Sequence, residues 1–160
     1  MTSERVIVLV EDNANDEELM LRAFRKSGIS NRVVILRDGA EALDYFFSRG
    51  AHANRAQSDI VQVVLLDLKL PKINGMEVLR QLREDERTQL LPIVILTSSA
   101  EAQDIVRCYS LGANSYVRKP VDFTQFVDAV RQLGQYWLMI NQAAPSLIDE
   151  ITLGGTSRRR

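Results

Sequence analysis

Short apolar segments alternate with amphipathic helical segments along most of the chain. Five of the apolar segments are predicted to be strands: residues 6–10, 32–36, 61–67, 93–96 and 115–118. The first four are rich in Val, Ile and Leu, as expected of strands buried on both faces of a parallel sheet. The alternation therefore predicts an α/β fold in which βα units wind doubly around a five-stranded parallel sheet.

Five amphipathic segments are predicted to be helices. They are expected at about residues 16–27, 40–47, 76–85, 100–111 and 123–140. Asn15 and Glu18 have the spacing of a capping box for the first helix, Asp122 precedes the fifth, and Ser98 or Ser99 is the expected cap of the fourth. The fifth helix carries one apolar stripe: Phe123, Phe126, Val127, Val130, Leu133 and Trp137. This stripe is expected to pack against the sheet.

Two segments depart from the pattern. Residues 48–59 are polar, contain Gly50 and are predicted to form an extended loop. Residues 141–160 lose the helical periodicity and end in Gly-Gly-Thr-Ser-Arg-Arg-Arg, so a flexible tail is expected there. The chain is therefore predicted to be one domain, residues 1–140, followed by this tail.

The composition excludes several classes of protein. Lys and Arg number 20 and Asp and Glu 21, so the net charge of −1 makes neither nucleic acid nor an anionic membrane an expected partner. The single cysteine, Cys108, excludes an internal disulfide, and with the single histidine, His52, it argues against a zinc site. No apolar run approaches the ~20 residues that span a bilayer, and no signal peptide is recognisable, so a cytoplasmic protein is predicted.

Polar side chains follow four of the predicted strands. Glu11 and Asp12 follow the first strand, and Asp67 ends the third. Thr97 follows the fourth strand and Lys119 the fifth. Because the carboxyl ends of neighbouring parallel strands meet at one edge of a sheet, three carboxylates, a hydroxyl and an amine are expected to converge there.

Such a group of carboxylates is unfavourable unless its negative charge is compensated. Two carboxylates about 5 Å apart repel by roughly 3 kcal/mol at an effective dielectric constant near 20, so either a proton is shared or a cation binds. Oxygen ligands favour Mg²⁺, which commonly bridges to phosphate oxygens, so phosphoryl transfer is the leading prediction, with Lys119 and Thr97 facing the phosphoryl group. Two simpler interpretations stay open: Glu11 and Asp12 could cap a helix or face solvent, and Asp67 could form a structural salt bridge with Lys119.

Five short motifs together resemble the receiver domain of two-component response regulators of the chemotaxis-regulator type. They are VEDN at 10–13, LLDLKLP at 65–71, NG at 74–75, LTS at 96–98 and KP at 119–120. The resemblance covers about residues 5–135. It implies a flavodoxin-like fold with strand order 2-1-3-4-5, five helices and an extended C-terminal helix.

The resemblance also implies the roles of the acidic residues. Asp67 would be the phosphoacceptor. Glu11 and Asp12 would bind Mg²⁺ together with Asp67, and the backbone carbonyl of Lys69 would complete the protein ligands. The phosphoryl group would come from a phosphohistidine of a sensor histidine kinase.

The remaining motifs are those of a conformational switch in the family. Lys119 would contact the phosphoryl group, and its bond to Pro120 would be cis. Thr97 would move toward the new phosphate. Tyr116 would rotate with it and report the change on the face formed by the fourth helix, the fifth strand and the fifth helix.

The chain length and the C-terminal helix suggest the partners. About twenty residues follow the fifth helix, so a stand-alone receiver is expected, which docks to its kinase, to a phosphotransfer protein or to a second copy. The segment at 48–59 and the long aromatic helix resemble the small regulators paired with bacterial, especially cyanobacterial, phytochromes. Residues 136–140 place apolar side chains all around the helix, which predicts a homodimer unless the tail folds back over them.

Three alternatives to a phosphate-accepting receiver were compared with the motifs. A phosphatase of the haloacid-dehalogenase type also uses an Asp nucleophile and Mg²⁺, but its Asp-x-Asp motif follows the first strand, whereas Asp67 follows the third. A nucleotide-binding module needs a Gly-rich turn after the first strand, where Glu11 and Asp12 stand instead. A receiver that serves as a docking module without accepting phosphate remains the alternative.

Overall fold

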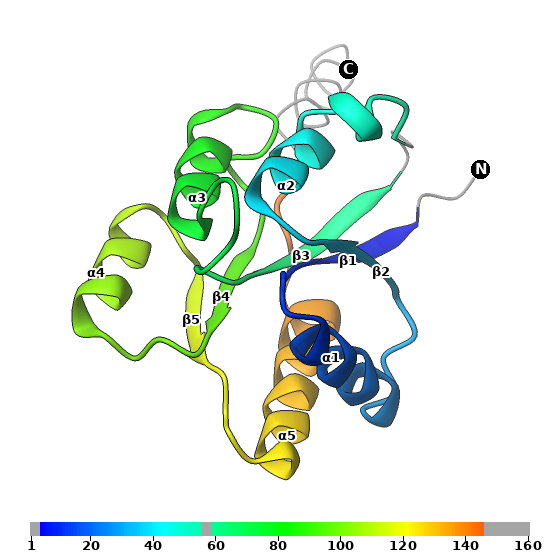
Figure 1. Cartoon of the computed structure of the whole chain (residues 1–160). Helices are drawn as coiled ribbons and strands as arrows, with labels where there is room; N and C mark the ends of the chain where they lie inside the picture. Colours follow the sequence, from blue (N-terminus) through cyan, green and yellow to red (C-terminus); the bar gives the residue numbers. More distant parts are fainter. Residues whose placement is uncertain (1–3, 56–58, 146–160) are drawn as a thin grey trace.

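The computed structural model describes residues 4–55 and 59–145, in which strands and helices alternate along the chain (Figure 1). The strands are β1 Arg5–Val10, β2 Arg32–Leu36, β3 Ile60–Leu66, β4 Ile93–Thr97 and β5 Ser115–Arg118. The α-helices are α1 Ala14–Lys26, α2 Gly39–Phe46, α3 Gly75–Glu84, α4 Ala102–Ser110 and α5 Phe123–Gly134. A 3₁₀ turn, η1 (Gly50–His52), lies in the predicted loop at 48–59, and a π-helical segment, η2 (Gln135–Ile140), continues α5.

All five strands are parallel, in the order β2-β1-β3-β4-β5. The predicted flavodoxin-like fold and its strand order are therefore confirmed. Val10, the last residue of β1, pairs with Leu36 on one side and with Leu66 on the other. This register brings the carboxyl ends of β1 and β3 together at the centre of the sheet.

The sheet is covered on both faces. Helices α1 and α5 lie on one face, and α2, α3 and α4 on the other (Figure 1). Alternate residues of β1 divide between the two cores: Val6, Val8 and Val10 face α2 and α3, whereas Ile7 and Leu9 face α1 and α5. Each such side chain stabilises the fold by roughly 1.5–3 kcal/mol when it is fully buried.

Four helices begin with a side-chain cap. The capping residues are Asn13, Asp38, Asn74 and Asp122, and each accepts a hydrogen bond from the backbone N–H three residues later. The predicted cap of α1 by Asn15 is wrong, because β1 ends at Val10 and the helix begins only four residues later. Asn13 directly precedes the first helical residue and is therefore the cap, whereas Asn15 lies inside the first turn.

The predicted cap of α4 by Ser98 or Ser99 is also wrong. The helix begins after Glu101, which forms no side-chain cap. The hydroxyl of Ser99 instead donates to Asp104 Oδ2 at 2.7 Å and accepts from the Glu101 N–H at 3.3 Å. Ser99 therefore holds the loop before α4 together from outside the helix.

The apolar stripe of α5 packs against the sheet as predicted, except for Phe123, whose ring lies under the Arg22 and Lys26 side chains. Phe126 and Val130 are buried in the core that α1 and α5 share, and Val127, Leu133 and Trp137 pack at its edge. Of the predicted tail at 141–160, the part from residue 146 onward lies outside the described residues. Within the described segments, no helix has both the length and the apolar character that crossing a membrane requires.

The π-helical segment at the end of α5 has a long-range partner. The Asn141 N–H donates to the Tyr136 carbonyl, five residues back, at 2.6 Å. The Trp137 carbonyl accepts a hydrogen bond from the side chain of Gln62, a buried residue of β3, at 3.2 Å. The end of the helix is thereby joined to the middle of the sheet.

Candidate functional site

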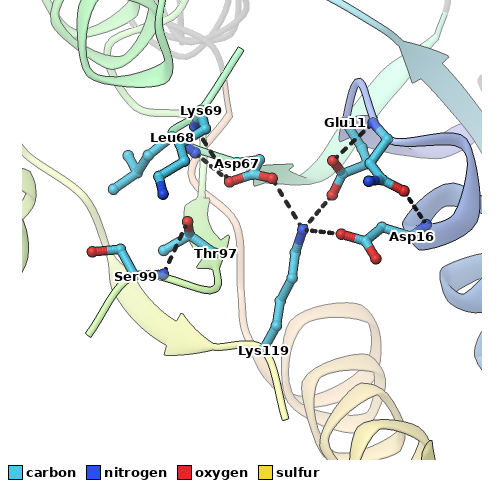
Figure 2. A network of polar contacts seen from close by, with 9 residues as sticks. Glu11, Asp16, Asp67, Leu68, Lys69, Thr97, Ser99 and Lys119 are labelled. Carbon is cyan, nitrogen blue, oxygen red and sulfur yellow. Dashed lines mark hydrogen bonds and ion pairs between the residues drawn. The ribbon is translucent and has the colours of Figure 1, made fainter. Parts of the chain in front are cut away.

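The polar residues predicted at the strand ends lie together at one edge of the sheet (Figure 2). Glu11 follows β1, Asp67 follows β3 and Lys119 follows β5. The Lys119 ammonium donates hydrogen bonds to Glu11 Oε1 and to Asp67 Oδ2, the second at 3.0 Å. The side chains of Lys119 and Asp67 are each 10% exposed and that of Glu11 is 2% exposed. Three ionisable groups therefore share one largely buried site.

A fourth ionisable residue, Asp16, belongs to this network and was missed from the sequence. Its Oδ2 accepts from Lys119 Nζ at 3.0 Å. The predicted cap at Asn15 made Asp16 the first helical residue, and this position gave no reason to expect its side chain to point toward the site. The available signal was Asn13, because a cap there places Asp16 in the first turn, close to the end of β1.

Burial and ion pairing act against each other in the site. Loss of solvent raises the pKa of Glu11 to about 7, although the hydrogen bond from Lys119 works to lower it. For Lys119, burial disfavours the charged form, but the interactions with Glu11 and Asp67 outweigh it and raise the pKa. The ammonium therefore stays charged while the carboxylates around it compete for one cation.

The backbone after β3 orients the Asp67 carboxylate. Its Oδ1 accepts from the Leu68 N–H at 2.7 Å and lies 3.4 Å from the Lys69 N–H. Its Oδ2 is left to face Lys119. Gly75, the first residue of α3, packs directly beneath this segment and donates its N–H to the Leu68 carbonyl at 2.8 Å. Both oxygens of the Asp67 carboxylate therefore have hydrogen-bond partners, and the backbone that carries it packs against the start of α3.

Three of the carboxylates could share a metal ion. Glu11, Asp12 and Asp67 each offer one oxygen, and these three atoms lie within 4.8 Å of one another. Ligands of an octahedral Mg²⁺ stand about 3 Å apart when adjacent and about 4.2 Å apart when opposite, so one ion could be shared by all three after the side chains move inward or through bridging waters. The all-oxygen donor set fits a hard divalent cation. A ligand role for the carbonyl of Lys69, whose side chain is exposed, stays a prediction.

The loop after β4 connects Thr97 with Tyr116. Thr97 is fully buried, and its hydroxyl oxygen lies 3.5 Å from the Ser99 N–H. The Tyr116 hydroxyl donates to the Ser99 carbonyl at 2.9 Å. Burial raises the pKa of Tyr116 and keeps it a donor. The predicted switch residues are therefore linked through Ser99.

The prediction of a cis bond between Lys119 and Pro120 is wrong. Within residues 4–55 and 59–145 every peptide bond is trans. The Lys119 N–H pairs with the Thr97 carbonyl at 2.7 Å, and its side chain already points into the site (Figure 2). The trans form, which Pro favours by about 0.5–1 kcal/mol, is compatible with this direction.

Two regulatory proteins match most of the chain and are themselves covered over most of their length. It is 41% identical over 138 residues to the probable methanogenesis regulatory protein FilR2 of Methanothrix harundinacea, covering 86% of each chain. It is 32% identical over 134 residues to the response regulator Rcp1 of Synechocystis, covering 84% of this chain and 89% of Rcp1.

Solved structures of phytochrome response regulators share the fold. Phosphorylated RcpA, a cyanobacterial phytochrome response regulator, matches with a TM-score of 0.81 at 34% identity, over 89% of this chain and 99% of RcpA. The bacteriophytochrome response regulator AtBRR matches with a TM-score of 0.69 at 50% identity, over 87% and 99% of the two chains. The Mn²⁺-bound form of Rcp1 matches with a TM-score of 0.80 at 31% identity, over 88% and 99%.

The family assignment follows from the sequence as well. The model of the response regulator receiver domain matches residues 7–131, which contain β2 to β5 and most of β1 and α5. These residues include the acidic cluster, Thr97 and Lys119. The chain therefore belongs to the response regulator receiver domain family and is homologous to the phytochrome response regulators.

Proposed function

We propose that this receiver accepts a phosphoryl group from a sensor histidine kinase on Asp67, in a reaction that requires Mg²⁺. The observation that carries the proposal is the position of the Asp67 carboxylate. It lies within 4.8 Å of Glu11 and Asp12 oxygens, is held by backbone N–H groups at one oxygen and contacts Lys119 with the other. A fixed nucleophile next to a cation-binding cluster is the arrangement that phosphoryl transfer needs.

In the proposed reaction, each step has a residue of the site to perform it. An Asp67 oxygen attacks phosphorus, the N–P bond of the phosphohistidine breaks, and the electron pair leaves with the imidazole as an acyl phosphate forms. Mg²⁺ held by Glu11, Asp12 and Asp67 would neutralise the negative charge that gathers there. Lys119 neutralises a phosphoryl oxygen, and the Thr97 hydroxyl donates to another.

The signal would leave the site through the loop after β4. Thr97 moves toward the new phosphate and disturbs Ser99, whose carbonyl binds the Tyr116 hydroxyl. Tyr116 lies on β5, so its rotation changes the face made by α4, β5 and α5. A groove of about 810 Å³ along β5 and α5, lined in part by Val117 and Tyr136, lies on this face.

The partner kinase is proposed to be a phytochrome. The receiver and this kinase are proposed to meet in the cytoplasm. The likeness to RcpA, Rcp1 and AtBRR supports this choice. Phosphotransfer from a purified phytochrome kinase, compared with an unrelated histidine kinase, tests it. Equal rates from both kinases would contradict a phytochrome as the dedicated donor.

A homodimer through the C-terminal helix is the second part of the partner proposal. Tyr136 is 47%, Met139 80% and Ile140 66% exposed, so apolar side chains cluster on one end of the helix. Light scattering of the full chain at about tens of micromolar should give twice the chain mass, and Met139→Asp should return it to the monomer. A monomeric mass for the wild type would contradict the proposal.

Incubation with acetyl phosphate and Mg²⁺ tests the phosphoacceptor role. The wild type should gain the mass of one phosphoryl group, labile at alkaline pH, and Asp67→Asn should gain none. Asp44→Asn, which changes a partly exposed carboxylate that pairs with Arg49 away from the site, is the matched control and should react like the wild type. An unmodified wild type would favour the docking module, and turnover of many phosphate monoesters would favour a phosphatase.

A further inference from the structure

The Lys119 ammonium has three N–H donors and three carboxylate partners (Figure 2). Two of these partners, Glu11 and Asp67, also belong to the set of carboxylates that could bind a metal ion. The third, Asp16, does not belong to that set. Asp16 is thus the one partner that Lys119 does not share with the expected ion.

Asp16 is held in place by the first turn of α1. Its N–H donates to the Asn13 side chain at 3.0 Å, and the Asn13 N–H donates to Glu11 Oε2 at 3.2 Å. The side chains of Glu11 and Asp16 therefore reach Lys119 from one short segment of chain. The Asp16 side chain is 37% exposed, so its charge is only partly desolvated.

We propose that Asp16 is a positioning residue, which keeps the Lys119 ammonium beside Asp67 when Glu11 and Asp67 bind a divalent cation. The inference rests on the proposed function and concerns the unphosphorylated protein. A divalent ion at Glu11 and Asp67 repels the ammonium and weakens its two shared ion pairs. Asp16 then supplies the remaining carboxylate, so Lys119 stays within reach of an incoming phosphoryl group.

The proposal makes a prediction for metal binding alone. Without the Asp16 charge, the ammonium keeps only the two carboxylate partners that it shares with the ion, so it competes more strongly with Mg²⁺ for Glu11 and Asp67. Calorimetric titration of the full chain with Mg²⁺ should give a dissociation constant about three- to tenfold higher for Asp16→Asn than for the wild type. Asp16→Glu should recover most of the affinity.

The matched control is Glu18→Gln. It removes the same charge from the same helix at an exposed position, and no hydrogen bond or ion pair of Glu18 is present in the described part of the chain. Its dissociation constant for Mg²⁺ should stay within about twofold of the wild type. An equal loss in both variants would show a general effect of charge and overturn the role of Asp16.

A comparison in a second background separates positioning from simple attraction of the ion. In Lys119→Met the ammonium is absent, so Asp16→Asn should change the Mg²⁺ dissociation constant clearly less than it does in the wild type. Equal changes in the two backgrounds would refute action through Lys119.

Nuclear magnetic resonance of the Lys119 ammonium gives a readout that does not depend on the Lys119 variant. With Mg²⁺ at saturation, its proton signal should persist in the wild type and broaden in Asp16→Asn. Retention of the signal in the variant would contradict the proposal. A wild type that shows these effects but forms no acyl phosphate would contradict the proposed function alone.

Discussion

The close packing of Gly75 against the segment that carries Asp67 makes Gly75→Ala an informative perturbation. A Cβ atom at this position would lie 2.1 Å from the Asp67 carbonyl oxygen and 2.7 Å from the Leu68 Cα. Both are backbone atoms, so no side chain can rotate out of the way. Either the start of α3 moves out, or the segment that carries Asp67 shifts.

The expected loss of stability is moderate. Overpacking of a dense interior costs about 1–3 kcal/mol, and replacing Gly by Ala in a helix returns about 0.5–1 kcal/mol. We therefore expect Gly75→Ala to lower the free energy of unfolding by about 1–2 kcal/mol. The effect on chemistry should be larger, because the Leu68 N–H that fixes Asp67 Oδ1 at 2.7 Å moves with the segment. A displacement of about 1 Å can reduce a rate by about a hundredfold.

Two measurements check this reasoning. Urea unfolding gives the change in stability, and the rate of phosphorylation by acetyl phosphate gives the change in chemistry. The control is Gly134→Ala within α5, where a Cβ would meet the flexible side chain of Ile29, with Cδ1 at 2.4 Å. This control should unfold within about 1 kcal/mol of the wild type and react at the same rate. A Gly75→Ala protein with wild-type stability and wild-type rate would refute the argument.

Three further predictions concern charged or titrating groups outside or within the site. Lys119→Met leaves buried carboxylates without their cation, so it should lower the free energy of unfolding by about 3 kcal/mol in the absence of Mg²⁺. Saturating Mg²⁺ should restore part of this stability, which thermal melting measures. A melting temperature that does not respond to Mg²⁺ would contradict cation binding by the cluster. Arg83 donates to three backbone carbonyls and to the Asn114 side chain, so Arg83→Met should cost about 2–4 kcal/mol in urea unfolding, and a loss below about 1 kcal/mol would mean that water replaces these bonds. Burial raises the pKa of the Cys108 thiol from 9.0 to about 11, so its reaction with a thiol reagent should keep accelerating with pH toward 11, whereas a plateau near pH 9 in the folded protein would contradict the burial. Because the folded protein keeps this thiol protonated while the unfolded chain ionises near 9, stability should fall as the pH rises from about 9 to 11.

Four of the strands, β1 to β4, could be predicted from the sequence because each contains a short apolar run that is followed by a polar residue. Val10 followed by Glu11, and Leu66 followed by Asp67, marked both the strand end and the site. The same rule held for Thr97, which is the last residue of β4. Strand ends are thus local signals, and the convergence of the site followed from the parallel order.

Other features depend on contacts that local patterns do not contain. Asn13 and Asn15 are equally good capping residues by type, and only the position of the strand end selects Asn13. The Ser99 hydroxyl could not be assigned without the position of Asp104. The contact of Asp16 with Lys119 joins residues 103 positions apart, and it needs both the start of α1 and the direction of a lysine side chain.

The π-helical segment at residues 135–140 determines in which directions the side chains at the end of the helix point. Each residue turns the side-chain direction about the helix axis by about 100° in an α-helix and by less in the wider π-helix, so removing one residue before Trp137 would rotate the later side chains of this segment by roughly that angle. Met139 and Ile140 would then point where other side chains point now, and the Trp137 carbonyl would lose its alignment with Gln62. Insertions or deletions here would therefore change which side chains at the end of the helix are exposed to solvent, while the edge of the sheet that carries Asp67 keeps its arrangement.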